Sequence, residues 1–248
     1  MGLATELATA FDPVTLAEQV GMVPDPWQAK VLRSPSRQLV LNCSRQSGKS
    51  TITALLALHE ALYQAPALVL LLSPSLRQSQ ELYGKVREFY TAVADSQVAV
   101  QEESALRMRL TNSSRIVSLP GKEATVRGYS GVSLLVIDEA ARVADDLYFA
   151  IRPMLAVSSG RLAALSTPAG KRGWFHEQWT DGSDTWERVQ ITAQQCPRIS
   201  PEWLAQERGS IGEWWYRQEY ECQFLETEDQ LYRYEDIQAA LDPSVLPL

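Results

Sequence analysis

This 248-residue sequence has few cysteines, no apolar run long enough to cross a membrane, and no surplus of basic residues. The three cysteines, Cys43, Cys196 and Cys222, are odd in number, and their spacings fit no disulfide framework or zinc site. This favours a reducing, intracellular setting. No stretch is apolar over the roughly 20 residues needed to cross a bilayer, and no basic leader precedes an apolar block at the N-terminus. We therefore expect neither a membrane partner nor a secretion signal.

The formal net charge is −7, which argues against a uniformly basic surface for nucleic acid. If DNA is a partner, its phosphates must meet a local basic patch, or one completed by another domain or subunit. Charged residues make up 21% of the chain, a normal level for a globular protein, so global disorder is excluded. No internal repeat is visible.

Short apolar runs alternate with stretches of helical spacing over most of the chain. The runs that predict strands are residues 38–43, 67–73, 133–139, 161–167 and 186–192. Several are apolar at successive positions, as strands buried on both faces of a parallel sheet are. The pattern predicts a three-layer α/β fold with a mainly parallel central sheet.

Two helices and one hairpin are expected between these strands. Residues 49–64 and 75–94 have the apolar spacing of helices. The segments 106–112 and 114–120 alternate in polarity and flank a polar turn, which predicts a hairpin.

The sequence changes in character after about residue 192. Residues 193–248 contain no buried strand; they begin with helical spacing after a proline and end in an acidic, proline-containing stretch from 226. We predict a core over residues 1–192, followed over 193–248 by a small helical lid and a linker.

The segment SRQSGKST at 44–51 lies between a predicted strand and a predicted helix, the setting of a phosphate-binding loop. Lys49 is expected between the β- and γ-phosphates, the Ser50 hydroxyl on Mg²⁺, and Gly48 where the backbone approaches the ligand. The loop consensus has glycine where this chain has Cys43; a chance Gly-Lys-Ser at a helix start is the alternative. The expected nucleotide contacts here are Ser44, Arg45, Gln46, Ser47, Gly48, Lys49, Ser50 and Thr51.

Two carboxylates, Asp138 and Glu139, end the apolar strand at 133–139. The carboxyl end of a parallel strand faces the ligand crevice. Asp138 is expected to hold Mg²⁺, and Glu139 to polarise the water that attacks ATP. The alternative is a solvated strand end.

Other polar residues are candidates on weaker grounds. Ser166 and Thr167 end the strand at 161–167 and are expected to sense the γ-phosphate, although Thr-Pro also explains a simple turn there. Gln28 is expected to read the adenine edge; the alternative is an exposed glutamine at a helix start. Trp27 beside it is expected in the core; shielding of the base is the alternative.

Three arginines are candidates for the guanidinium that stabilises a phosphoryl-transfer transition state. Arg45 lies in the loop, Arg127 precedes the acidic strand, and Arg142 follows it. A solvated surface charge is the alternative for each.

Taken together and in order, these motifs resemble the phage large terminases, the DNA-packaging ATPases of tailed viruses. The segments that carry the resemblance are PDPWQAKVL at 24–32, SRQSGKST at 44–51, SPSLRQSQEL at 73–82, VRGYSG at 126–131, LLVIDEA at 134–140 and STPAGKRGWFHEQW at 166–179. The resemblance covers nearly the whole chain. It implies a P-loop ATPase core over 1–192 and the lid subdomain of that family from about 193.

The resemblance also implies a role for individual residues. Gln28 matches the adenine-contacting motif, and Arg45, Lys49 and Ser50 match the phosphate loop.

Further along the chain, Asp138 and Glu139 match the magnesium and catalytic acids. Ser166 and Thr167 match the motif that couples hydrolysis to movement. Arg127 matches an Arg-Gly element proposed to act as a finger in trans.

Such proteins use ATP and Mg²⁺ in the host cytoplasm. They form a homo-oligomeric ring, expected to be a pentamer, on the capsid portal, with the small terminase subunit and double-stranded DNA as further partners. A full-length member also has a C-terminal nuclease domain. This chain stops at LDPSVLPL, where that nuclease is expected to begin, so we expect no DNA cleavage by it.

Two other functions are compatible with parts of the pattern. A helicase-like or repair DNA translocase would share Gln28, Lys49, Asp138 and Glu139, but nothing after residue 193 resembles a second lobe. A nucleotide-gated scaffold would not need the complete catalytic set.

An aromatic cluster follows the predicted core. Trp214, Trp215, Tyr216 and Tyr220 have helical spacing, which favours the core or a subunit interface over stacking on DNA. The basic residues Lys171 and Arg172 are candidates for DNA contact or for plain solvation.

Overall fold

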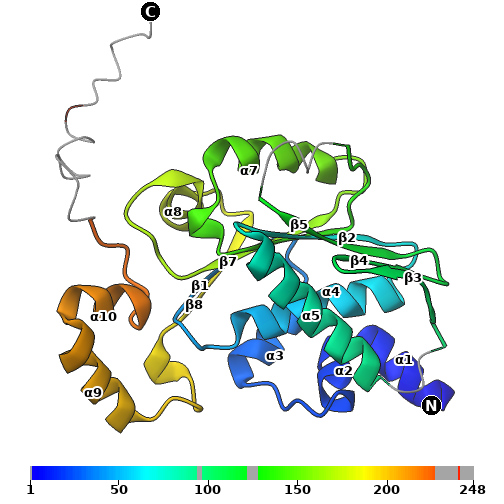
Figure 1. Ribbon diagram of the computed structural model, residues 1–248, viewed down its shortest axis with the longest axis horizontal. Helices are drawn as coiled ribbons and strands as arrows, with labels where there is room; N and C mark the ends of the chain where they lie inside the picture. Colours follow the sequence, from blue (N-terminus) through cyan, green and yellow to red (C-terminus); the bar gives the residue numbers. More distant parts are fainter. Residues whose placement is uncertain (1, 94–96, 122–127, 227–239, 241–248) are drawn as a thin grey trace, which may run out of the picture.

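The residues described by the computed structural model, 2–93, 97–121, 128–226 and 240, form an eight-stranded sheet between helical layers (Figure 1). The strand order is β3-β4-β5-β2-β6-β7-β1-β8. The strands are β1 Gln38–Cys43, β2 Leu68–Ser73, β3 Val100–Ser104, β4 Arg107–Leu110, β5 Arg115–Pro120, β6 Leu134–Asp138, β7 Arg161–Ser166 and β8 Trp186–Ile191. The predicted α/β fold is confirmed: pairing is parallel from β5 to β8, and antiparallel only where β3 and β4 extend the edge.

Helices cover both faces of the sheet. On one face lie α1 Leu3–Phe11, α2 Pro13–Gln19, α3 Pro26–Arg33, α4 Lys49–Tyr63 and α5 Leu76–Ala92. On the other lie η1 Ala140–Arg142, α7 Asp145–Ile151, η2 Arg152–Leu155 and α8 Gly173–Thr180. The predicted helices at 49–64 and 75–94 correspond to α4 and α5, and the predicted hairpin to the antiparallel pair β4–β5.

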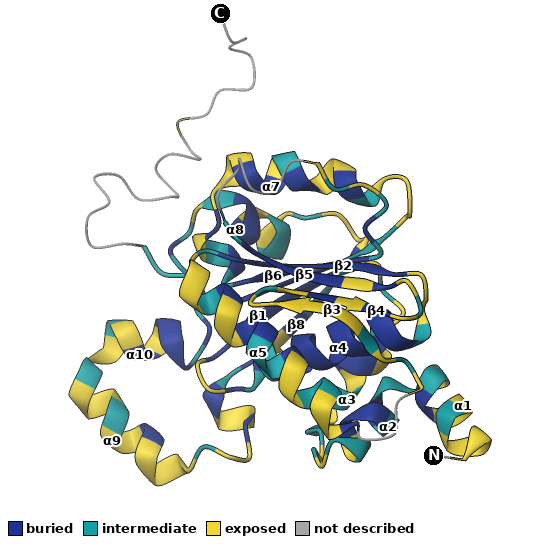
Figure 2. Cartoon of the chain, turned by 45° about the vertical axis from the view of Figure 1, so that its right-hand side comes forward, coloured by how far each residue is buried: buried dark blue, intermediate teal, exposed yellow. Residues whose placement is uncertain are grey.

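The strand period of two divides the core into two layers. In β2, Val69 and Leu71 join the cluster beneath α4 and α5, whereas Leu68, Leu70 and Leu72 join the cluster beneath α7 and α8. All of β2 is buried, as Figure 2 shows for the centre of the sheet. Truncation of such a residue to alanine costs roughly 2–5 kcal/mol, because the neighbours only partly fill the cavity.

The parallel register brings the carboxyl ends of neighbouring strands to one edge. β6, β7 and β1 are adjacent, with Asp138 opposite Leu165, and Leu41 opposite Leu165. The chain segments that leave these three strands therefore lie side by side, which places the motifs after residues 43, 138 and 166 together.

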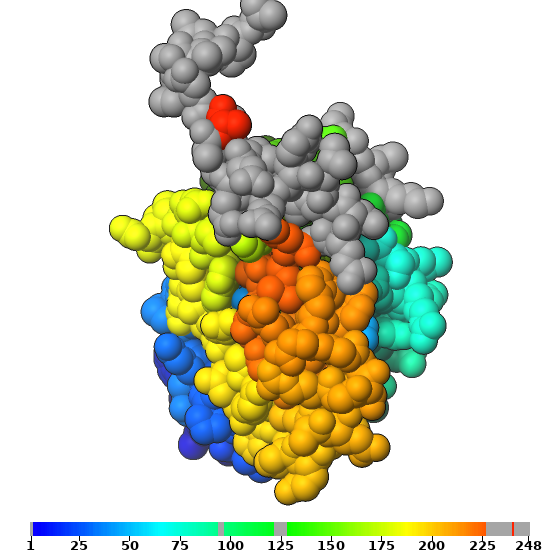
Figure 3. All heavy atoms as spheres, turned by 90° about the vertical axis from the view of Figure 1, so that its left-hand side faces the viewer, coloured from blue at the N-terminus to red at the C-terminus, as the bar shows by residue number. Residues whose placement is uncertain are grey.

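After β8 the chain forms η3 Ala193–Gln195, α9 Pro201–Ile211 and α10 Glu213–Glu219. Ser200 caps α9 by accepting from the Trp203 N–H, and Pro201 occupies its first turn. In the space-filling view α9 and α10, in orange, lie beside the yellow segments that precede them (Figure 3). The division at residue 192 remains a prediction, and the predicted linker lies almost wholly outside the described residues.

The aromatic cluster of α10 is split between core and surface. Tyr216 and Tyr220 are buried with Leu204 in a small satellite core, whereas Trp215 is 52% exposed. The core interpretation therefore holds for the two tyrosines and not for Trp215. Within the described residues, no helix combines the length and apolarity that crossing a bilayer requires.

Candidate functional site

The loop between β1 and α4 has the backbone shape of a phosphate cradle. Gly48 has φ +90°, and a Cβ at this position would lie 2.8 Å from Gln28 Nε2. The left-handed conformation favours glycine, and a side chain at this position would also displace the Gln28 amide. The Ser47 hydroxyl donates to the Ser44 carbonyl at 2.9 Å, and the Ser44 N–H donates to the Ile191 carbonyl at 2.8 Å, which ties the loop to itself and to β8.

A hydroxyl and a carboxylate meet where α4 begins and β6 ends. Ser50 Oγ donates to Asp138 Oδ2 at 3.2 Å. Burial, together with the adjacent Glu139 carboxylate, raises the pKa of Asp138 to about 6. Oxygen atoms of this kind are the ligands that Mg²⁺ prefers.

The next carboxylate lies between two cations. Glu139 Oε1 is 3.5 Å from Lys49 Nζ, and its Oε2 accepts from Arg142 Nη1 at 2.9 Å. The backbone of Glu139 is left-handed, with φ +51° and ψ +43°. This conformation is uncommon for a residue other than glycine, and such residues are found at functional sites.

The end of β7 is linked to the same group. The Arg142 Nη1 that binds Glu139 also donates to Thr167 Oγ1 at 3.2 Å. Ser166 is fully buried, and its hydroxyl has no hydrogen-bond partner within the described residues. The structure thus places Ser166 and Thr167 next to the acidic pair.

Gln28 lies beside the loop and not on the surface. It is 1% exposed, and its Oε1 accepts from the Asp25 N–H at 2.9 Å, which fixes the side chain at the start of α3. The alternative of an exposed glutamine is therefore wrong. Trp27 is partly buried against the core, in keeping with the expectation for it.

Two of the three candidate arginines lie at this site. Arg45 Nε is 3.3 Å from Glu219 Oε2, and Arg142 Nη2 is 3.7 Å from Glu219 Oε1. The Arg45 N–H also donates to the Glu219 carbonyl at 3.0 Å. Arg127, the third candidate, lies outside the described residues.

Two residues of the C-terminal helical segment reach the loop, and sequence reasoning missed both. One is Glu219 on α10. The other is Arg198, whose Nη2 donates to the Ser47 carbonyl at 2.7 Å and whose Nη1 lies 2.6 Å from Asp25 Oδ2. Arg198 is 151 positions from Ser47 and Glu219 is further still from the loop, and no local pattern marked them.

An open cleft of about 750 Å³ lies beside the loop. The residues that line it include Arg45, Gly48, Lys49, Ser50, Glu139, Arg198 and Tyr220. Gln46 and Thr51 line it as well, and Thr51 Oγ1 accepts from Lys85 Nζ at 3.4 Å. The cleft is large enough for a nucleotide, and its polar groups converge on the loop.

The three cysteines are free thiols beneath this site, and all are buried. Burial raises the pKa of Cys43 to about 12, so its thiol stays protonated at neutral pH. Its small side chain ends β1 inside the core.

Among the known proteins to which this chain is similar are large terminase subunits. The family model described as terminase large subunit, T4likevirus-type, N-terminal, matches residues 40–239. The sequence is 24% identical over 250 residues to the large terminase subunit of Thermus virus P23-45; the match covers 87% of this chain and 51% of that protein. The chain therefore spans about half the length of the curated relatives it matches.

Solved structures match most of this chain. The ATPase domain of the large terminase of Thermus phage P74-26 superimposes with a TM-score of 0.77 at 24% identity, over 84% of this chain and 97% of that one. The large terminase of bacteriophage D6E in complex with ADP has a TM-score of 0.67 at 14% identity, over 82% of this chain and 54% of that one. At such identities the likeness establishes the fold.

Proposed function

Because this chain belongs to the family formed by the N-terminal part of T4likevirus-type terminase large subunits, we propose that it hydrolyses ATP to move double-stranded DNA into a viral procapsid. The family match confirms the resemblance drawn from the sequence motifs. The observation that carries the proposal is the convergence of Lys49 on Glu139 at 3.5 Å and of Ser50 on Asp138 at 3.2 Å.

The residues present fit a magnesium nucleotide. The loop N–H groups and the Lys49 ammonium suit phosphate oxygens, with Ser44, Gln46, Ser47 and Thr51 completing the cradle. Gln28, beside Gly48, is placed to read the base edge by its amide. The solved relative from phage D6E that carries ADP supports a nucleotide in this cleft.

Ser50 and Asp138 would hold the Mg²⁺, which when bound neutralises charge on the phosphates. Neither residue acts on the attacking water. The two side chains are in contact in the structure, so two oxygen ligands lie together beside the loop.

Glu139 is the general base in this proposal. Its carboxylate is held between Lys49 and Arg142, so it is oriented before any substrate arrives. On ATP binding, Lys49 turns to the phosphates and Glu139 accepts the proton of the attacking water. Arg142, which also contacts Thr167, links this event to Ser166 and Thr167 and hence to movement.

Two arginines are proposed to stabilise the transition state, one from the subunit that holds the ATP and one from its neighbour. Arg45 acts within its own subunit from the loop, and Arg127 acts on the site of a neighbouring copy. Mixing Arg127→Ala subunits with Glu139→Ala subunits should restore part of the activity, because the intact site of an Arg127→Ala subunit can receive the intact Arg127 of a Glu139→Ala neighbour. No restoration would favour Arg45 as the finger or a structural role for Arg127.

Membership of this family supports a proposal about the wider assembly. We infer a ring of these chains, expected to be a pentamer, on the capsid portal in the host cytoplasm, with the small terminase subunit as partner and with a nuclease domain in the full-length protein. DNA cleavage is not expected from the residues present here.

Release of phosphate from Mg-ATP by the purified chain tests the enzymatic proposal, with Glu139→Ala as the inactive reference. A strand-separation assay tests the helicase-like alternative, since a packaging motor moves on duplex DNA without unwinding it. Failure of the wild-type chain to bind or hydrolyse Mg-ATP would reject the proposal.

A further inference from the structure

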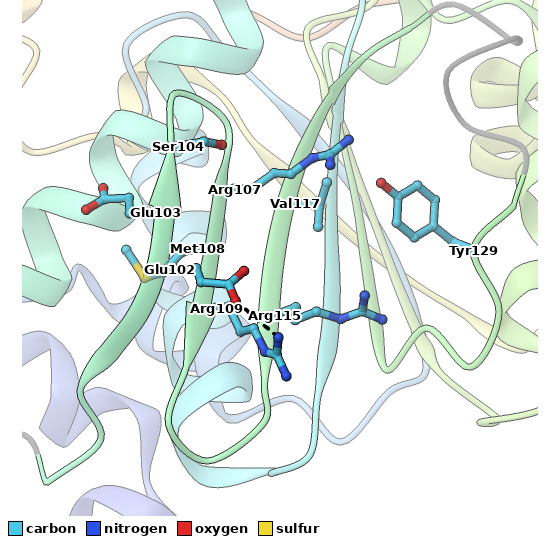
Figure 4. A pocket seen from close by; sticks show the side chains of 9 residues that line it. All are labelled: Glu102, Glu103, Ser104, Arg107, Met108, Arg109, Arg115, Val117 and Tyr129. Atoms are coloured by element: carbon cyan, nitrogen blue, oxygen red, sulfur yellow. Dashed lines mark hydrogen bonds and ion pairs between the residues drawn. The ribbon is translucent and has the colours of Figure 1, made fainter.

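A second groove of the molecule lies at the far edge of the sheet, away from the nucleotide cleft. Strands β3, β4 and β5 line it together with Tyr129, and its volume is about 380 Å³. Three arginines, Arg107, Arg109 and Arg115, stand along it in Figure 4, with Tyr129 across the groove.

Side chains along β4 alternate between the two faces of the sheet, so both of its arginines lie on the same face. Met108 and Leu110 are buried in the core cluster beneath α4 and α5, so Arg107 and Arg109 point to the opposite face. The yellow surface of these strands in Figure 2 marks this exposure. The face continues onto β5 through Arg115, which is exposed as well.

The strand register sets like charges against each other. Arg109 pairs directly with Arg115 across the antiparallel β4–β5 ladder. Like charges in directly opposite positions destabilise a sheet. Only Arg109 has a carboxylate beside it, Glu102 at 3.3 Å on β3; Arg107 and Arg115 make no ion pair with any residue that the structure describes.

An anion between the strands would offset this repulsion. Arg107 and Arg109 are about 6.8 Å apart along one face of β4, and Arg115 lies opposite Arg109 on β5, so the three guanidinium groups form a cluster of cations across two strands. Guanidinium groups bind phosphate oxygens in two-point contacts, and the Tyr129 hydroxyl adds a further donor. The groove therefore fits a chain of phosphates better than a single small anion.

The groove offers no apolar anchor for a protein partner. The large hydrophobic side chains exposed among the described residues lie elsewhere, and Val117, which lines the groove, is buried. Protein interfaces are centred on buried apolar or aromatic anchors, whereas contacts to a nucleic-acid backbone are polar and basic.

We propose that the arginine face of β4 and β5, formed by Arg107, Arg109 and Arg115, binds the phosphodiester backbone of duplex DNA. This inference rests on the proposed function and names the basic patch that an acidic chain needs for such a partner. It requires no contact between this face and the nucleotide cleft.

The test compares the variant Arg107→Thr/Arg115→Thr with the wild-type chain. Binding of a short fluorescein-labelled duplex of mixed sequence is measured by anisotropy between about 50 and about 200 mM salt. We expect affinity to fall about ten-fold or more, and the slope of log affinity against log salt to decrease by about two, since each phosphate contact contributes about 0.9. Arg37→Thr, at an exposed arginine before β1, is the matched control and should bind as the wild type does.

Thermal denaturation separates binding from folding. Threonine suits a strand, and its introduction removes the repulsion between positions 109 and 115, so the melting temperature should stay the same or rise. A structural role for the arginines would lower it.

Unchanged duplex affinity in the double variant would overturn the proposal, as would a wild-type chain that fails to bind duplex at low salt. Unchanged DNA binding with altered self-association in sedimentation would assign the face to contacts between copies instead. Phosphate release from Mg-ATP, measured on the same samples, reports on the enzymatic proposal separately.

Discussion

The Glu219 carboxylate on α10 lies 3.3 Å from Arg45 Nε in the phosphate loop, and the Glu219 main-chain carbonyl accepts from the Arg45 N–H. The same carboxylate is 3.7 Å from Arg142, which binds Glu139. One acidic residue of the C-terminal helices therefore contacts both Arg45 of the phosphate loop and Arg142 beside Glu139. A γ-phosphate would compete with this carboxylate for them.

Glu219→Gln removes the competing charge while keeping the shape of the side chain. We expect the KM for ATP to fall by about five-fold, at the low end of measured coupling between sites. Steady-state phosphate release over a range of ATP concentrations measures it. Glu202→Gln, at an exposed acid of α9, is the control. A KM that rises, or that matches the control, would contradict competition between Glu219 and the nucleotide.

Glu139→Ala tests the proposed base. Turnover should fall by about 10²- to 10⁴-fold, because the attacking water loses its proton acceptor, while ATP binding persists. Single-turnover hydrolysis and equilibrium binding of a fluorescent ATP analogue separate the two effects. Glu88→Ala, at an exposed position of α5, should behave as wild type. Near-normal turnover of Glu139→Ala would exclude Glu139 as the base.

Arg198 holds the Ser47 carbonyl and the Asp25 carboxylate together, and thereby fixes the loop against the helix that carries Gln28. Arg198→Ala should raise the KM for ATP about ten-fold with a smaller change in kcat, since it disturbs binding more than chemistry. Arg198→Lys should recover part of the loss, because lysine retains one of the contacts.

The control for that experiment is Arg208→Ala, an arginine of the same helical segment that pairs with Glu213 and does not line the cleft. If Arg198→Ala lowers the melting temperature as Arg208→Ala does and leaves KM unchanged, Arg198 only attaches the helices to the core.

His59 links stability to pH. Its Nε2 lies 2.9 Å from the Thr9 carbonyl, and burial lowers the pKa of the imidazole below its ordinary value. The folded state thus binds the proton less readily than the unfolded state. The stability contributed by neutral His59 is complete above the unfolded pKa of about 6.5 and is lost as pH falls from there toward the folded pKa.

The measurement is the melting temperature between about pH 7.5 and pH 5.5. We expect His59→Gln, which keeps a donor for Thr9, to show a shallower decline over this window than the wild type. Equal slopes in the two proteins would mean that other groups cause the decline.

Much of the fold and of the candidate site can be predicted from local sequence patterns. The runs at 38–43, 67–73, 133–139 and 161–167 are strands because they are apolar at successive positions, and β2 is buried along its whole length. The loop before Lys49 and the acids after β6 follow from residue types at fixed positions next to a strand end. Such features depend on neighbours within a few residues, so the sequence alone determined them.

The tertiary structure decided which distant residues meet. Glu219 and Arg198 reach the loop because α10 and the segment before α9 pack beside β8, and the repulsive pair of Arg109 and Arg115 exists because of the β4–β5 register. Strand order, register and helix docking depend on how separated apolar surfaces fit one another across the core. That fit depends on the whole chain, and no short window of sequence contains it.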